Sequence, residues 1–262
     1  MDLLKVTFII AHHNYQQFLG GAIQSALNQT YENTHVCVID DCSNNVNDVN
    51  DIVSSFEKPN CITQLNDNLI VKRSNLITTL YITDRAHKQA YARNRGMEYC
   101  WEDTDIFAIL DADDENYPNK IEQCIKPFLL YPTEIGAVYA DTRIYNIDTD
   151  TYVDEYREPY DMYKLLQECI VHSGSLISKY ALNEVLENGL VFDEELPPCE
   201  DYDLWIRISE KFLIEHIPQI LSFVRVHTQN STNTTTHNFR MSRLEKIHQK
   251  IQARRNASQS TN

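Results

Sequence analysis

The chain has 262 residues, of which 42% are hydrophobic, enough to bury a full core in one principal domain. Its formal net charge of −15 and pI of about 4.9 disfavour partners with an anionic backbone, so no nucleic-acid partner is expected. No run approaches eighteen apolar residues, and the opening segment carries Asp2 beside a short apolar run, which does not fit a signal peptide. We therefore expect a cytoplasmic protein with free cysteines.

Residues 1–114 alternate short apolar runs with stretches of helical spacing. Such a βαβα series favours an α/β fold, with a mostly parallel central sheet flanked by helices on both faces. The pattern predicts strands at Val6–Ala11, His35–Asp41, Thr78–Thr83 and Ile106–Ala112, and helices at Gln16–Gln29, Val46–Phe56 and Gln89–Trp101.

Residues 115–228 are less regular and predict a smaller, mixed half. The clearest helix is Glu200–Phe212, with apolar residues on one stripe and acids in the first turn, where the helix dipole favours them. The remaining predictions are a strand at Ile135–Asn146 followed by a hairpin, a helix at Asp161–Glu168, a strand or turn at His172–Ser178, and a closing segment to His227.

Residues 229–262 are polar and include a basic helical stretch near Phe239–Arg255. From His237 onward there are six Arg or Lys and one Glu, a local charge of about +5 on an acidic protein. We expect a partly helical tail outside the core. It is either a solvated helix, which we favour, or a segment that docks on an anionic membrane or on another subunit.

Carboxylates follow two of the predicted strands, at Asp40–Asp41 and Asp111–Asp114. Ligands of such sheets bind beyond the carboxyl ends of the strands. Acids gathered there repel one another unless a cation or a hydrogen-bonded ligand lies between them. None of the six glycines forms a GxGxxG or GxxxxGK[ST] loop, so a phosphate-bearing ligand needs a metal ion or Arg and Lys side chains.

Five segments resemble, in order and rough spacing, the motifs of the family 2 glycosyltransferases, over residues 5 to about 232. The resemblance implies a GT-A fold, with residues 1–114 binding the nucleotide sugar, residues 115–228 binding the acceptor, and the catalytic domain ending at 228. It also implies inverting transfer of a sugar from a nucleotide-diphosphate donor, with a UDP-sugar expected, to a hydroxyl of a glycan, lipid-linked or protein acceptor. The segments are VTFIIAHHNYQQFLGGAIQSALNQTYENTHVCVIDDCS, AYARNRGME, ILDADDENYPNKI, EDYDLWIRIS and FVRVHTQNS.

The DxD element of the family matches Asp111-Ala112-Asp113. By resemblance Asp113 coordinates Mn²⁺ or Mg²⁺, and Asp111 contacts the ribose or the water shell of the metal. Oxygen ligands suit these cations, which stabilise a diphosphate leaving group. His227 matches a late family histidine that is a third metal ligand or donates to a phosphate oxygen. Without the resemblance, the acids would be read as a polar turn after a strand.

The base-binding element implies that Asp41 hydrogen-bonds the nucleotide base. The turn after the first strand, with Ala11, His13 and Asn14, departs from the usual Pro-Thr-Tyr-Asn-like pattern, and His13 replaces an aromatic ring that stacks on the base. Arg93 matches a cation near the pyrophosphate, with Arg95 and Lys88 as competing choices.

The acidic pair at the start of the predicted helix implies the general base. Asp201 is the first choice and Glu200 the second, although both also fit acids that support a helix dipole. His172 and Ser173 are expected on the acceptor side. Trp205 offers a sugar-stacking face there, or packs in the core, which its apolar helix favours.

Two other functions fit parts of the pattern. A nucleotidyltransferase shares the sheet and its carboxylates, but typically opens with a glycine-rich loop that residues 11–19 lack. A non-catalytic nucleotide-sugar-binding module would have lost a carboxylate, whereas both acidic motifs are intact.

Overall fold

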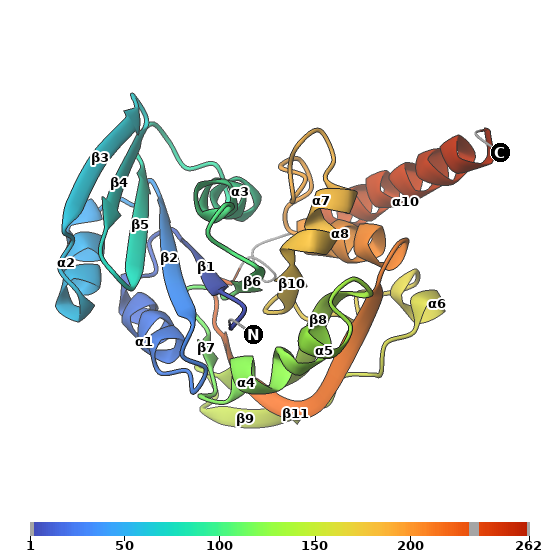
Figure 1. Cartoon of the computed structure of the whole chain (residues 1–262), viewed down its shortest axis with the longest axis horizontal. Coiled ribbons are helices and arrows are strands. Elements are labelled where there is room, and N and C mark those ends of the chain that lie inside the picture. The colour runs from blue at the N-terminus through green and yellow to red at the C-terminus, as the bar shows by residue number, and fades with distance from the viewer. Residues whose placement is uncertain (1–2, 231–235, 261–262) are drawn as a thin grey trace.

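The computed structural model describes residues 3–230 and 236–260. In this part of the chain eleven strands join in one sheet, in the order β3-β4-β5-β2-β1-β6-β10-β8-β11-β7, with β9 paired to β8 (Figure 1). Its centre is parallel and consists of β5 (Ile77–Ile82), β2 (Thr34–Asp41), β1 (Val6–His12) and β6 (Ile106–Ile109). These strands are buried almost throughout, as expected for parallel strands covered on both faces. The predicted α/β class is confirmed.

Helices cover both faces of this parallel region. α1 (Gln16–Leu27) and α2 (Val46–Phe56) share one apolar cluster with Phe8 and Val38, and α3 (Gln89–Cys100) packs in a second cluster with Ile39. Gly96 permits the close approach of α3, because a Cβ there would lie 2.5 Å from Ile39 Cδ1. The packing directs the loop before α3 toward the carboxyl ends of β1 and β2.

The second half of the chain contains both parallel and antiparallel strand pairs, which agrees with the mixed half that the sequence predicts. Its long strands β8 (Ile135–Asn146) and β11 (Leu213–Val226) are parallel, and β10 (Leu176–Ser178) joins them to β6 in antiparallel pairing. The other elements are β7 (Glu115–Asn116), α4 (Lys120–Cys124), α5 (Lys126–Leu130), β9 (Thr151–Glu155), α6 (Met162–Leu165), α7 (Lys179–Val185) and α8 (Glu200–Ser209).

A hairpin at the sheet edge was not predicted. It comprises β3 (Cys61–Asn66), exposed throughout, and β4 (Leu69–Arg73). Their sequences, CITQLN and LIVKR, mix apolar and polar residues without the regular alternation that indicates a half-buried strand. No described helix is long and apolar enough to cross a membrane.

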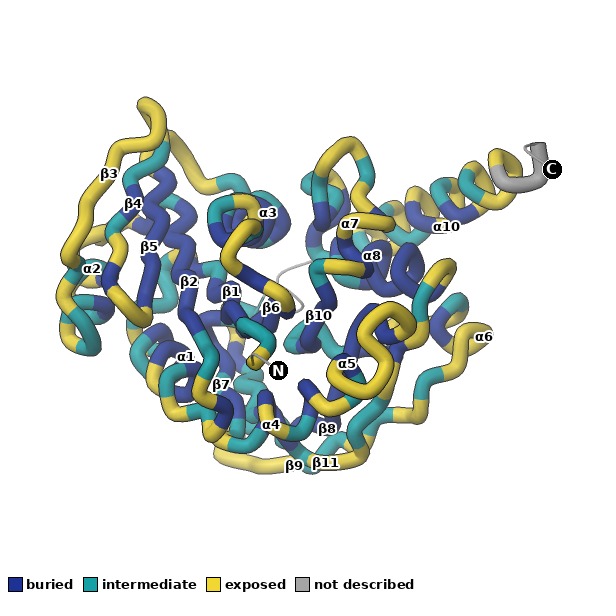
Figure 2. Tube along the Cα trace, viewed as in Figure 1, coloured by how far each residue is buried: buried dark blue, intermediate teal, exposed yellow. Residues whose placement is uncertain are grey.

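The expectation of a tail outside the core is wrong. α10 (His237–Ser260) lies along α7 and α8 and buries Ile247 and Ile251, which are 0% and 5% exposed (Figures 1 and 2). Lys250 Nζ lies 2.7 Å from Asp193 Oδ2 and 3.2 Å from Asp203 Oδ2. The basic helix therefore neutralises acids of this same chain and is not a freely solvated helix. Docking on a membrane or on another subunit stays a hypothesis.

Candidate active site

A cavity of about 810 Å³ lies at the carboxyl ends of the central strands, with walls from both halves of the chain. This is where a doubly wound sheet binds its ligands. Nine of the predicted site residues line it: Ala11, His13, Asp41, Arg93, Asp111, Ala112, Asp113, His172 and Ser173.

Arg93 joins two acids that are far apart in sequence. Its Nη2 donates to Asp111 Oδ1 at 2.5 Å, and its Nη1 donates to Glu200 Oε1 at 3.0 Å. Arg93 is only 3% exposed. Burial acts to lower its pKa, but the charges of Asp111 and Glu200 outweigh this and raise it. Arg93 therefore stays charged and holds the end of β6 against the start of α8.

Asp113 is held from the other side by the segment after β11. Its Oδ2 accepts from Asn230 Nδ2 at 2.9 Å and lies 3.1 Å from His227 Nε2. The Gln229 N–H donates to His227 Nδ1, which favours the tautomer with its proton on Nε2, directed at Asp113. The His227 ring stacks on Phe18, with 5.1 Å between ring centroids. Burial and the charge of Asp111 raise the pKa of Asp113, whereas the contact with His227 acts to lower it.

The three expected metal ligands do not form a complete cluster. No group of three His, Cys, Asp or Glu side chains among residues 3–230 and 236–260 is arranged to hold a metal ion. Asp111 is turned to Arg93, whereas Asp113 and His227 lie together. A carboxylate oxygen and an imidazole nitrogen suit Mn²⁺, and Mg²⁺ and Mn²⁺ commonly complete their coordination with substrate phosphates and water. The residues thus fit a cation that arrives with a diphosphate.

Asp41 orders the loop that enters α3. Its Oδ2 accepts from the His87 N–H at 2.9 Å and from the Lys88 N–H at 2.7 Å. Burial raises the pKa of this carboxyl, although the two N–H groups act to lower it. His13 donates from Nδ1 to the Asp41 carbonyl at 2.7 Å, so its ring is fixed at the cavity wall.

Asn14 does not line the cavity, and its predicted contact with the nucleotide is not supported. It adopts a positive φ of 58°. Its N–H donates to Ser43 Oγ at 2.9 Å, and its Oδ1 accepts from the Asn44 N–H at 2.8 Å. Asn14 therefore ties the turn after β1 to the turn after β2.

The acidic pair at the start of α8 divides into two roles. Glu200 is 1% exposed and paired with Arg93, so an acceptor cannot reach it. The second choice for the base is therefore corrected: Glu200 positions the start of α8. Asp201 is partly exposed and lies three residues after Pro198, which lines the cavity, whereas Asp201 itself does not line it. Burial and the charge of Glu200 raise the pKa of Asp201 to about 7, against the opposing effects of Arg93 and the Tyr202 N–H. A carboxyl with this pKa is suited to exchange a proton near neutral pH.

His172 and Ser173 lie on the cavity wall contributed by the second half. The Gly174 N–H donates to His172 Nδ1 at 3.0 Å, which places the ring proton on Nε2. Burial lowers the pKa of His172 well below its usual value, helped by the charges of Arg157 and Lys120. His172 is therefore a neutral imidazole whose Nε2–H is a hydrogen-bond donor.

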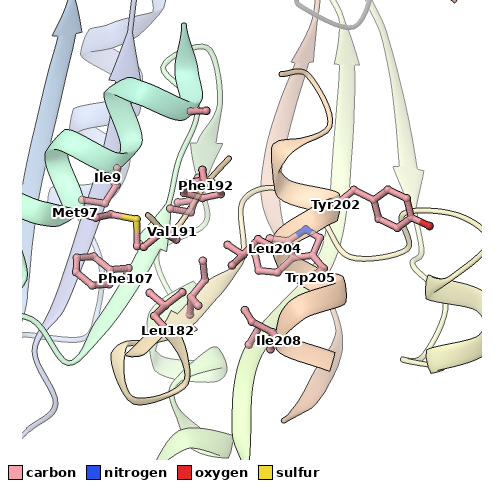
Figure 3. Packing of buried hydrophobic residues seen from close by; sticks show 14 of the residues in the cluster. Ile9, Met97, Phe107, Leu182, Val191, Phe192, Tyr202, Leu204, Trp205 and Ile208 are labelled. Atoms are coloured by element: carbon pink, nitrogen blue, oxygen red, sulfur yellow. The ribbon is translucent and has the colours of Figure 1, made fainter. Parts of the chain in front are cut away.

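Trp205 packs in the core, as its apolar helix favoured, and the alternative of a sugar-stacking face is wrong. Its side chain is 0% exposed and belongs to the apolar cluster that includes Val191 and Phe192 (Figure 3). A ring buried on both faces cannot stack on a sugar. Trp205 instead fixes α8 in the core.

Several wall residues were not predicted from the sequence. Arg225 donates from Nη1 to the Asp113 carbonyl at 2.9 Å, and its backbone N–H donates to Asp114 Oδ1 at 2.9 Å. The FVRVH segment that contains Arg225 was already noted, and an arginine two residues before His227 was the available signal. Tyr15, Lys88, Asn230 and Phe239 also line the cavity. Only Lys88 had been considered, as an alternative to Arg93.

Comparisons with known proteins identify relatives of this chain. Residues 7–186 match the family model described as glycosyl transferase family 2. An uncharacterized glycosyltransferase of Haemophilus influenzae is 26% identical over 243 residues, covering 88% of this chain and 68% of that protein. A chondroitin synthase of Pasteurella multocida is 24% identical over 230 residues, covering 87% of this chain and 21% of that protein.

The fold is similar to that of a solved glycosyltransferase structure. S. aureus TarS residues 1–349 in complex with UDP-GlcNAc superpose with a TM-score of 0.67 at 12% identity, covering 89% of this chain and 62% of that one. The match confirms the expected GT-A fold. This chain spans about a fifth of the Pasteurella chondroitin synthase and about two thirds of the Haemophilus protein.

Proposed function

The chain belongs to glycosyl transferase family 2, and we propose that it transfers a hexosyl or N-acetylhexosaminyl group from a UDP-sugar to an acceptor hydroxyl with inversion. One observation carries the proposal: a single cavity is lined by the acids after β2 and β6 and by Arg93, and Arg93 pairs with Glu200 at the start of α8. Structures of TarS with UDP and with UDP-GlcNAc support a uridine donor. A glycan, lipid-linked or protein hydroxyl is the acceptor.

Asp113 and His227 are the residues that would hold Mn²⁺ or Mg²⁺, with Asp111 near enough for its charge to raise the pKa of Asp113. The cation supplies electrostatic stabilisation to the diphosphate leaving group. In the alternative role, in which His227 does not hold the cation, its Nε2–H donates to a phosphate oxygen. The guanidinium of Arg225 on the cavity wall is a further donor.

Asp201 is proposed as the general base, which takes the proton of the acceptor hydroxyl as its oxygen attacks the sugar carbon. Inversion requires this carboxylate on the face opposite the leaving group. The buried Arg93–Glu200 pair fixes the N-terminus of α8 and so orients Asp201. The neutral His172 and the Ser173 hydroxyl offer hydrogen bonds to the acceptor from the adjoining wall.

The proposal is tested with a panel of nucleotide sugars in the presence of Mn²⁺, measuring release of the nucleoside diphosphate. We expect turnover with one or a few UDP-sugars, its loss on addition of EDTA, and recovery with excess Mn²⁺. Undiminished turnover in chelator would remove the metal from the proposal. Nucleotide binding without turnover of any donor would favour a non-catalytic binding module.

A further inference from the structure

The start of α10 reaches the donor cavity. Phe239, in the first turn of this helix, lines the cavity with a side chain that is 36% exposed. Lys88 Nζ lies 5.9 Å from the centroid of its ring, and the Arg243 guanidinium lies 4.4 Å from it. Because Lys88 is the N-cap residue of α3, the ring lies beside the loop that Asp41 orders.

The two cations around this ring differ from their neighbours on α10. Lys246, Lys250 and Arg254 each form an ion pair with an acid of the same chain. Neither the Lys88 ammonium nor the Arg243 guanidinium has a carboxylate within ion-pair distance in the described part of the chain, despite a net charge of −15. Arg243 Nε is also buried with no hydrogen-bond partner among the described residues. Positive charge here is available to an anionic ligand.

The position of Phe239 is fixed by the rest of α10. Ile247 and Ile251 pack in the same cluster as Trp205, and Lys250 is 3.2 Å from Asp203 on α8. Asp203 is two residues from Asp201, so the helix that presents the ring is bound to the helix that presents the proposed base. The ring is thereby held at one place on the cavity wall.

We propose that α10 completes the donor site, with the ring of Phe239 packing against the nucleoside of the bound donor and Arg243 contributing positive charge toward its diphosphate. The assignment rests on the proposed UDP-sugar donor. Aromatic rings stack on bases of any kind, and a neighbouring cation favours the phosphates. Phe239 and Arg243 are then donor-binding residues supplied by a segment whose composition is that of a polar tail.

The test is titration calorimetry of the full chain with UDP and Mn²⁺. Phe239→Ala should weaken UDP binding roughly tenfold, the effect expected for loss of one base–aromatic contact, and Phe239→Tyr should restore it. The matched control is Met241→Ala on the same helix, because Met241 is 43% exposed and does not line the cavity. Equal UDP affinity of Phe239→Ala and Met241→Ala would overturn the assignment of Phe239.

A second pair of variants tests the charge. Arg243→Gln should weaken UDP binding several-fold. Lys246→Gln, which removes another cation of the same helix, one that is paired with Glu195, should not. Equal losses would show a general effect of surface charge and overturn the role of Arg243. UDP binding by the unmodified protein separates failure of the proposed function from failure of this assignment. If the unmodified protein does not bind UDP, the uridine donor is refuted and this assignment with it.

Discussion

Replacing Asp201 by Asn should have opposite effects on activity and on stability. The pKa of Asp201 is about 7 in the folded chain and 3.8 ordinarily. Above pH 7 the folded protein therefore holds an ionised carboxylate that burial disfavours. A difference of about three between the two pKa values corresponds to roughly 4 kcal/mol. Partial exposure of Asp201 to water reduces this, and we expect a gain of about 1–2 kcal/mol for Asp201→Asn at pH 8.

The pH dependence has a definite sign. A carboxyl whose folded pKa is raised binds its proton more tightly in the folded state, so its ionisation costs stability as pH rises from about 4 to about 7. Below pH 4 both states are protonated and the cost vanishes. The stability advantage of Asp201→Asn should therefore grow between pH 4 and pH 7 and level off above. Thermal unfolding would show it as a rise in Tm of about 2–6 °C at pH 8.

Activity should fall in the same variant. Loss of a general base costs about 10²–10⁴-fold in kcat, whereas donor binding, which the amide does not obstruct, should persist. The control is Asp51→Asn on α2, an exposed aspartate distant from the cavity that should change neither quantity. A variant that keeps its kcat, or that loses donor binding together with stability, would show that Asp201 is structural.

Two further predictions concern the core that supports the site. Trp205→Ala should lower the free energy of unfolding by about 3–5 kcal/mol in urea titrations. Trp205→Phe should lower the free energy of unfolding by less than Trp205→Ala, because it also removes a buried indole N–H that has no partner among the described residues. A larger loss for Trp205→Phe than for Trp205→Ala would contradict this explanation. Ile247→Ala should cost about 2–5 kcal/mol, whereas no loss would show that α10 is not packed in solution.

The central strands were predictable because burial on both faces leaves an unbroken apolar run in the sequence. The run at Val6–Ala11 became β1, and the helix at Val46–Phe56 was predicted with its observed bounds. The β3–β4 hairpin lies at an exposed edge and leaves no such run. In α10 two isoleucines four residues apart are the buried anchors, but polar neighbours dilute them in any average over the segment.

The strand-end acids of the site were predictable for a related reason. Parallel strands bring their carboxyl ends to one edge, so Asp41 and Asp113 meet at one cavity by topology alone. The contact of Arg93 with Glu200 spans 107 positions and depends on where α8 packs. The position of Phe239 on the cavity wall depends likewise on how α10 packs against the rest of the chain. Neither pairing leaves a periodic trace in the sequence.

The carboxylates of the cavity are only partly balanced by the positive side chains around them. Two arginines, Arg93 and Arg225, lie on its wall, and each is already bound to acids of the chain. His227 Nε2 lies 3.1 Å from Asp113 Oδ2 and acts to lower the pKa of that carboxyl. The remaining excess negative charge appears as raised pKa values of three carboxyls, for which burial is the first cause and neighbouring acids the second. These are Asp113, Asp114 and Asp201. Amides in place of these acids would remove this burial cost, so the acids are consistent with the proposal that a ligand brings positive charge to the cavity.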